Sequence, residues 1–197
     1  MARRSAEETR RHILKVAGDL FYARGVRAVG MDLVISRAEV ANATLYRQFA
    51  TKDDLVTAYL VSRNDDWWRH LRESAAAAPD ARARIRLLFD LTRQDMTRPG
   101  YRGCATLNIT SEFPDAEHPA HAAAVAHKTE VQEWLSEQLR EAGDTDPEDT
   151  AGKLLVILDG AQVLAAAMGT TTPGDHMTEL AEQLLEARLP APGTGSR

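Results

Sequence analysis

The sequence predicts an all-α protein of about nine helices. Apolar residues recur at helical spacing along nearly the whole chain, and no stretch alternates apolar and polar residues long enough to indicate a strand. The 197 residues, of which 44% are hydrophobic and 27% are charged, are typical of a globular chain that buries its own core.

The first half of the chain predicts four helices with clear start signals. The segment Ser5-Ala-Glu-Glu8 fits a capping box for the first helix, which Gly25 is expected to end. Two short helices follow, at about 31–38 and about 42–48, and Thr51 can cap a long fourth helix. The expected buried stripe of that fourth helix consists of Val56, Leu60, Asn64, Trp67 and Leu71.

The second half predicts five more helices. Pro79 and Asp80 begin the fifth, whose expected stripe is Ile85, Leu88, Phe89, Thr92 and Met96. The others are expected at about 103–112, from the loop ending at Pro119 to Ala142, at about 147–168, and after the turn 170–175 as far as about Leu189.

Charge is unevenly distributed along the chain. Residues 1–52 carry ten Lys and Arg against five Asp and Glu, a net +5, whereas the other residues carry 14 against 24, a net −10. A basic N-terminal segment on an otherwise acidic chain indicates a module that binds a polyanion. A basic surface that is only solvated is the alternative, and charge alone does not decide between the two.

The cysteine content and the apolar runs indicate a cytoplasmic protein. Cys104 is the single cysteine, which excludes an intramolecular disulfide framework and a Cys-rich zinc module. No secretory-type segment follows the basic start, and no uninterrupted apolar run approaches the roughly 20 residues that span a bilayer. We therefore expect no membrane association.

Three short helices within 50 residues are the plan of a helix-turn-helix module, whose second helix enters the major groove. In the helix at 42–48, Leu45 and Phe49 are four residues apart and are expected to pack inward. The side chains left outward bond phosphates and base edges, namely Asn42, Thr44, Tyr46, Arg47 and Gln48. A solvated helix of an ordinary bundle is the alternative at this point.

Three segments resemble the DNA-binding domain of the tetracycline-repressor (TetR) family over about residues 8–56. They are Thr9 to Phe21 with Gly25, then Ala43-Thr-Leu-Tyr-Arg-Gln-Phe49, then Thr51-Lys-Asp-Asp-Leu55. Two runs, Arg102 to Asn108 with Glu112-Phe-Pro and Leu158-Asp-Gly-Ala161, resemble the ligand-binding domains of that family more loosely. We accordingly expect a helix-turn-helix domain at 1–50, a ligand-binding and dimerisation domain at 51–189, and a disordered tail at 190–197.

The resemblance implies a set of DNA contacts and shows two departures. The implied contacts are Met31, Arg37, Asn42, Thr44, Tyr46, Arg47 and Lys52, and a basic arm is expected at Arg3, Arg4, Arg10 and Arg11. Glu39 stands where the family usually has Gly in the turn, so the turn is either right-handed or mildly strained. Ala41 stands where Ser often caps the reader helix.

The domain expected at 51–189 is predicted to form a homodimer, because the helix at 147–168 is apolar nearly all round and needs packing partners on two sides. A central helix of a monomeric bundle is the alternative. The resemblance implies a four-helix interface, with Leu155, Leu158, Ala161, Ala165, Leu180 and Leu184 as expected contacts. A homodimer also suits a near-palindromic duplex operator.

Polar residues on apolar stripes of the same domain predict a small-molecule site. The expected lining consists of Asn64, Trp67, Met96, Cys104, Asn108, Phe113, His127 and Trp134. With the resemblance, these residues predict a transcriptional repressor that a small, largely apolar ligand releases from its operator, without catalytic activity and without a cofactor. Two alternatives stay open, a metal-dependent hydrolase that uses His118 and His121, and a ligand-independent dimeric helical bundle.

Overall fold

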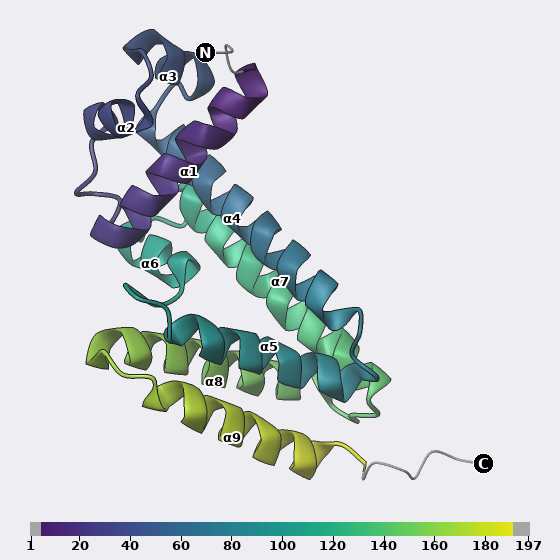
Figure 1. The fold of residues 1–197 in the computed structure, drawn as a ribbon. Coiled ribbons are helices and arrows are strands. Elements are labelled where there is room, and N and C mark those ends of the chain that lie inside the picture. The colour runs from purple at the N-terminus through teal and green to yellow at the C-terminus, as the bar shows by residue number, and fades with distance from the viewer. Residues whose placement is uncertain (1–4, 191–197) are drawn as a thin grey trace. The chain divides into compact units, whose positions relative to one another are not determined.

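The computed structural model describes residues 5–190, and in this range the chain forms nine helices and no strand, which confirms the all-α prediction (Figure 1). The helices are α1 (Ala6–Arg24), α2 (Met31–Ala38), α3 (Asn42–Gln48), α4 (Lys52–Ala75), α5 (Ala81–Met96), α6 (Ala105–Glu112), α7 (Pro119–Glu141), α8 (Pro147–Met168) and α9 (Thr172–Arg188). Arg3, Arg4 and nearly all of the predicted disordered tail lie outside the described residues.

The described chain forms two compact units, which differ from the predicted domains. Unit 1 consists of the residues up to Trp67 together with 105–126, and unit 2 consists of 68–104 with the residues from 127 onward. Helix α6 and the start of α7 belong to unit 1, where Ile109, Ala120 and Ala124 are buried in the N-terminal core, so this unit extends beyond residues 1–50.

A capping box begins α1, and a glycine lies where α1 meets α4. The predicted capping box is present, since the backbone N–H of Ser5 donates to Glu8 at 2.7 Å and the N–H of Glu8 donates to the Ser5 hydroxyl at 3.1 Å. A Cβ at Gly18 would lie 2.8 Å from the Tyr59 ring, so glycine permits the close approach of α1 to α4.

The buried residues predicted for α4 are confirmed in the first half of the helix and wrong at one aromatic position. Val56, Leu60 and Leu71 are buried, but Trp67 is half-buried and the neighbouring Trp68 is the buried indole, 6% exposed. The reason is a partner outside α4, because the indole N–H of Trp68 donates to the carboxylate of Glu130 on α7 at 2.8 Å.

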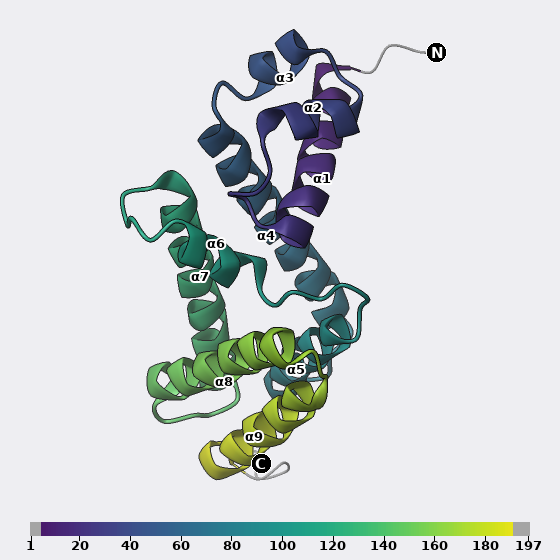
Figure 2. The ribbon, with the colours of Figure 1, turned by 90° about the vertical axis from the view of Figure 1, so that its left-hand side faces the viewer.

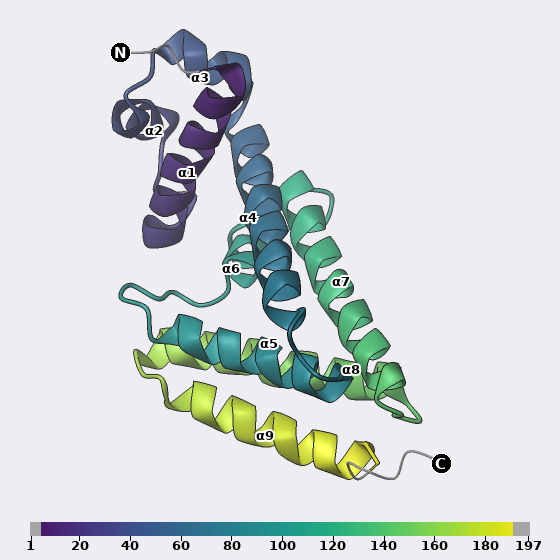
Figure 3. The ribbon, with the colours of Figure 1, turned by 45° about the vertical axis from the view of Figure 1, so that its right-hand side comes forward.

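In unit 2, α5, α8 and α9 lie side by side (Figures 1 and 3). All five residues of the predicted α5 stripe are buried. Helix α9 begins at Thr172, before the predicted end of the turn, and Gly174 in its first turn would place a Cβ 2.8 Å from the sulfur of Met96. Two arginines of α5, Arg82 and Arg86, donate to Glu182 of α9 at 2.5–2.6 Å, and the Arg86 hydrogen bond is the largest cause that lowers the pKa of Glu182 to about 2.

Helix α8 has one face in the core of unit 2 and one face open. Leu154, Leu158, Ala161 and Ala165 are buried, whereas Val156 is 74% exposed. Among the described helices, α8 alone is long and apolar enough to cross a membrane by length and composition. The sequence prediction missed this because Asp159 and Gln162 interrupt the apolar run.

Candidate nucleic-acid interface

Helices α2 and α3 form the predicted helix-turn-helix, with the boundaries that the sequence predicts for both helices. Glu39 ends α2 with φ 52° and ψ 45°, the left-handed conformation, and its N–H donates to the carbonyl of Ile35. Of the two alternatives for this turn, the strained one is present, because a side chain at a left-handed position costs about 1 kcal/mol relative to glycine.

Replacing Glu39 by glycine is expected to raise the free energy of unfolding by about 1 kcal/mol, because glycine adopts positive φ without a Cβ clash. Urea unfolding followed by circular dichroism measures the change. Ser36→Gly, an exposed position inside α2, is the matched control and is expected to destabilise the protein, since there glycine adds only backbone entropy to the unfolded chain. Equal destabilisation by both substitutions would refute the strain at Glu39.

Helix α3 packs on unit 1 through one face and presents the other to solvent. Leu45 is fully buried and Phe49, directly after the helix, is 2% exposed, as their spacing predicts. The opposite face carries exposed or half-buried polar residues, namely Asn42, Thr44, Tyr46 and Arg47. At the N-terminus, Ala41 caps the helix without a side-chain hydrogen bond, so neither Asn42 nor Thr44 replaces the missing serine.

Two residues of α1 hold the helix-turn-helix in place. The Arg10 guanidinium donates to the carbonyl of Gln48 at 2.9 Å and lies over the Phe49 ring, 4.3 Å from its centre. The imidazole Nε2 of His12 lies 2.9 Å from the carbonyl of Ala38. The C-terminal ends of α2 and α3 are therefore both fixed to α1.

The contact of Arg10 corrects its assignment to a flexible basic arm. Arg10 is half-buried and engaged with α3, because a guanidinium can satisfy a helix-end carbonyl and stack on an aromatic ring together. Arg11 is exposed, 4.0 Å from Glu7. No sequence signal within α1 marks Arg10, since its partners lie 38 residues away.

Next to α3 lies the first turn of α4, which carries Lys52. The turn is closed by a second capping box, in which the Thr51 N–H donates to Asp54 and the Asp54 N–H donates to Thr51, both at 3.0 Å. Arg37 and Arg47 are exposed, and within residues 5–190 neither they nor Lys52 form an ion pair. Three cations near the exposed face of α3 are thus available to phosphates. Met31 instead packs against the core of unit 1.

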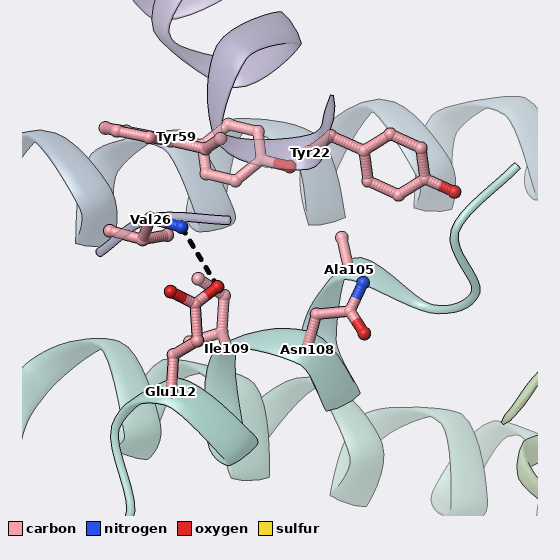
Figure 4. A pocket seen from close by; sticks show the side chains of 8 residues that line it. Tyr22, Val26, Tyr59, Ala105, Asn108, Ile109 and Glu112 are labelled. Carbon is pink, nitrogen blue, oxygen red and sulfur yellow. Dashed lines mark hydrogen bonds between the residues drawn. The ribbon is translucent and has the colours of Figure 1, made fainter. Parts of the chain in front are cut away.

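The residues predicted to line a ligand pocket fall in both units, so neither unit contains the whole set. Unit 1 holds Asn64, Trp67, Asn108 and Phe113, and unit 2 holds Met96, Cys104, His127 and Trp134. In unit 1, Asn108 lines a small pocket with Tyr22 and Tyr59 (Figure 4). The ring of Phe113 stacks on His118 at 4.3 Å.

Unit 2 gathers two of the predicted pocket residues around Trp68. The rings of Trp134 and His127 meet Trp68 edge-on, at 6.4 and 6.1 Å between centres. Burial, with a smaller contribution from the charge of Lys128, lowers the pKa of His127 to about 4. Met96 is buried against α9, and Cys104 is half-buried.

The predicted dimer residues lie on different faces of α8 and α9. Leu158, Ala161 and Ala165 are buried within unit 2, Leu155 and Leu184 are half-buried, and Leu180 is 49% exposed. The most exposed apolar side chains of α8 are instead Val156, Val163, Leu164 and Met168. A groove with a mainly apolar lining runs between the two helices.

The histidines of the hydrolase alternative are engaged with the chain itself. Nδ1 of His118 accepts the N–H of Ala120 at 3.2 Å, and Nδ1 of His121 lies 2.7 Å from the carbonyl of Phe113. In the described part of the chain, no group of three or more His, Cys, Asp or Glu side chains is placed to hold a metal ion. Nothing in this geometry favours a metal-dependent hydrolase.

Two family models match the chain. "Bacterial regulatory proteins, tetR family" matches residues 13–59, and "Tetracyclin repressor-like, C-terminal domain" matches residues 81–181. The crystal structure of SCO4454, a TetR-family transcriptional regulator from Streptomyces coelicolor, superposes with a TM-score of 0.88 at 31% identity, covering 92% of this chain and 96% of that one.

Curated relatives are transcriptional regulators as well. The HTH-type transcriptional activator FasR of Mycolicibacterium smegmatis is 33% identical over 100 residues, 49% of this chain and 45% of FasR. The HTH-type transcriptional regulator YjdC of Escherichia coli is 24% identical over 181 residues, 89% of this chain and 93% of YjdC.

Proposed function

Because the chain belongs to the TetR family of bacterial DNA-binding transcriptional regulators, we propose that it is a cytoplasmic repressor released from its operator by a small, largely apolar ligand. The observation that carries the proposal is the exposed polar face of α3 beside three cations without ion pairs among the described residues. Such a face suits a major groove, which admits one helix and is lined by phosphates.

In the proposed complex, α3 lies in the major groove and its first turn faces the bases. Asn42 and Thr44 contact base edges, Arg47 reaches a guanine or a phosphate, and Tyr46 bonds a phosphate. Lys52 meets the backbone at the N-terminus of α4, where the helix dipole also favours an anion. Arg37 borders the same groove from α2, whereas Met31 supports α2 from the core of unit 1.

The repressor is proposed to act as a homodimer through α8 and α9. Val156, Leu164, Met168 and Leu180 are large apolar side chains, each about half exposed or more, on adjacent helices of one unit. A contiguous apolar face of this kind is typical of an interaction site. The occupant that we propose is the same face of a second copy, because a two-fold dimer places two reader helices on the two halves of a near-palindrome.

The ligand is proposed to bind beside the Trp68 cluster, where burial keeps His127 neutral near pH 7. A neutral imidazole and two indoles suit an apolar molecule better than an ion. Release of DNA requires different ligand affinities of the DNA-bound and free forms, so DNA must weaken ligand binding by the same factor. Tryptophan quenching by lipophilic compounds, with and without operator DNA, measures that factor.

The test of the proposed function compares a duplex from the upstream region of the protein's own gene with a random duplex of equal length. We expect the upstream duplex to bind as a discrete dimer complex, with an affinity that falls steeply with salt because bound cations release counterions from phosphates. A reporter placed under the upstream region checks repression. Equal affinity for both duplexes over the whole salt range would exclude a sequence-specific repressor.

Substitutions of Lys52 and Asn42 are expected to distinguish residues that bind the DNA backbone from residues that recognise bases. Lys52→Ala should weaken binding to every duplex alike and lower the salt slope by about 1. Asn42→Ala should instead change base preference, with a loss of about 1–3 kcal/mol at one base pair. Binding to a library of single-base operator variants distinguishes the two effects. Lys153→Ala, in an exposed ion pair of α8, is the matched control and should leave binding unchanged.

A further inference from the structure

Glu112, the last residue of α6, is bonded to the segment that joins α1 to α2. Its carboxylate accepts the backbone N–H of Val26 at 2.9 Å (Figure 4) and also that of Arg27 at 2.8 Å. The Arg27 guanidinium donates in return to the backbone carbonyl of Glu112 at 2.8 Å. Three hydrogen bonds therefore hold one end of α6 to this segment, 85 residues earlier in the chain.

The segment is shaped to receive the carboxylate. Gly25 has φ +83°, and a Cβ added there would lie 3.3 Å from a carboxylate oxygen of Glu112. Glycine thus supplies the backbone conformation and leaves the approach open. Figure 2 shows α6 to the left of the C-terminal end of α1.

The position of this segment bears on the reader helix. Val26 and Val29 are each 1% exposed, so the segment is part of the unit 1 core and not a loose loop. It leads directly into α2, on which α3 packs. His12 and Arg10 fix the far ends of α2 and α3, whereas Glu112 fixes the chain just before α2.

We propose that Glu112 is a positioning residue for DNA reading, which sets the place of the helix-turn-helix through the backbone of Val26 and Arg27. The proposal rests on the DNA-binding function proposed above. Base readout needs side chains placed to within a fraction of an ångström, whereas non-specific binding to phosphates tolerates a shifted helix. Loss of the carboxylate therefore weakens operator binding selectively.

A purely electrostatic role of Glu112 makes the opposite prediction. An acidic residue that only repelled phosphates would, when removed, leave a protein that binds operator and random duplexes more tightly. Glu112→Gln removes the charge but keeps one acceptor oxygen, and Glu112→Ala removes both acceptors. If Glu112 acts by positioning, operator affinity is highest in the wild type, lower in Glu112→Gln and lowest in Glu112→Ala. An electrostatic role places both variants above the wild type.

The experiment measures operator and random-duplex affinity for the full-length wild type, both variants and Glu117→Ala, an exposed carboxylate of the following loop. Glu112→Ala is expected to lose about tenfold in operator affinity, equivalent to about 1.4 kcal/mol, with random-duplex affinity unchanged. Glu117→Ala should match the wild type. Unchanged operator affinity in Glu112→Ala would overturn the proposal.

Amide hydrogen exchange of the wild type without DNA gives a second readout, independent of DNA binding. The Val26 and Arg27 amides are expected to be protected, and their protection should fall in Glu112→Gln. Unprotected amides in the folded wild type would overturn the proposal even if Glu112→Ala does not fold. If the wild type binds no operator while these amides are protected, the proposed function is wrong, but the hydrogen bonds from Val26 and Arg27 to Glu112 are still present in solution.

Discussion

Replacing Leu164 and Leu180 together by glutamate is expected to give a folded monomer that binds operator about 100-fold more weakly, or worse. Both side chains are about half exposed, at 52% and 49%, so the charges would be solvated in the monomer. In a dimer they would be buried without partners, which costs several kcal/mol per interface. A monomer also loses the second half-site, which two linked reader helices bind at a high effective concentration.

Sedimentation velocity measures the oligomeric state, and a gel-shift titration measures the affinity. Val125→Glu is the matched control, because Val125 is 49% exposed on α7, outside α8 and α9. It is expected to remain dimeric and to bind operator like the wild type. A dimeric double variant would show that subunits meet through another face, and a monomeric variant with full affinity would show that dimerisation does not serve DNA binding.

Short-range patterns predicted the helix-turn-helix well. The predicted ranges of about 31–38 and about 42–48 coincide with α2 and α3, and the Leu45–Phe49 spacing that gives the inward face acts within a few residues. Caps are local in the same sense, and the one predicted at Ser5 is present. The exposed face of α3 also followed directly, because burial of Leu45 and Phe49 fixes the rotation of a seven-residue helix.

Contacts between distant residues could not be predicted in this way. The roles of Arg10 and Glu112 depend on partners 38 and 86 residues away, and periodicity carries no information about such pairs. The choice between Trp67 and Trp68 failed for the same reason, since both positions fit a helical stripe and Glu130 of α7 decides which indole is buried. The grouping of α6 with unit 1 is a further long-range property.

The sequence also could not predict which face of α8 packs inside the protomer. The sequence showed that α8 is apolar nearly all round, which predicted two buried sides without saying which side meets the protomer. The structure assigns Leu158, Ala161 and Ala165 to the protomer's own core and leaves Val156, Leu164 and Met168 open. The dimer proposal therefore keeps the two helices that the sequence suggested and changes most of the residues expected to touch.

The buried imidazole of His127 links pH to stability. It is 7% exposed and lies edge-on to Trp68, and burial lowers its pKa from 6.5 to about 4, with Lys128 adding to the shift. Between pH 4 and pH 6.5 the unfolded chain therefore binds a proton that the folded protein does not bind. Unfolding then takes up protons, and the free energy of unfolding falls as the pH falls through this window.

The expected loss from His127 is about 3 kcal/mol between pH 7 and pH 4, from about 1.4 kcal/mol for each unit of pKa difference. His127→Gln, which has no titrating group, should remove this part of the pH dependence. Urea unfolding of both proteins at intervals from pH 4 to pH 7 measures it, and the two stability curves should converge toward pH 4.

The ion pairs of Glu182 act in a different window, so the two groups can be separated. Its pKa is lowered from 4.5 to about 2, chiefly by the Arg86 hydrogen bond, and its contribution is present above pH 4.5 and lost as the pH falls toward 2. A slope between pH 4.5 and pH 6.5 that disappears in His127→Gln therefore belongs to the imidazole. If that slope persists in the variant, His127 does not cause it, and the imidazole would be protonated in the folded protein below about pH 6.5.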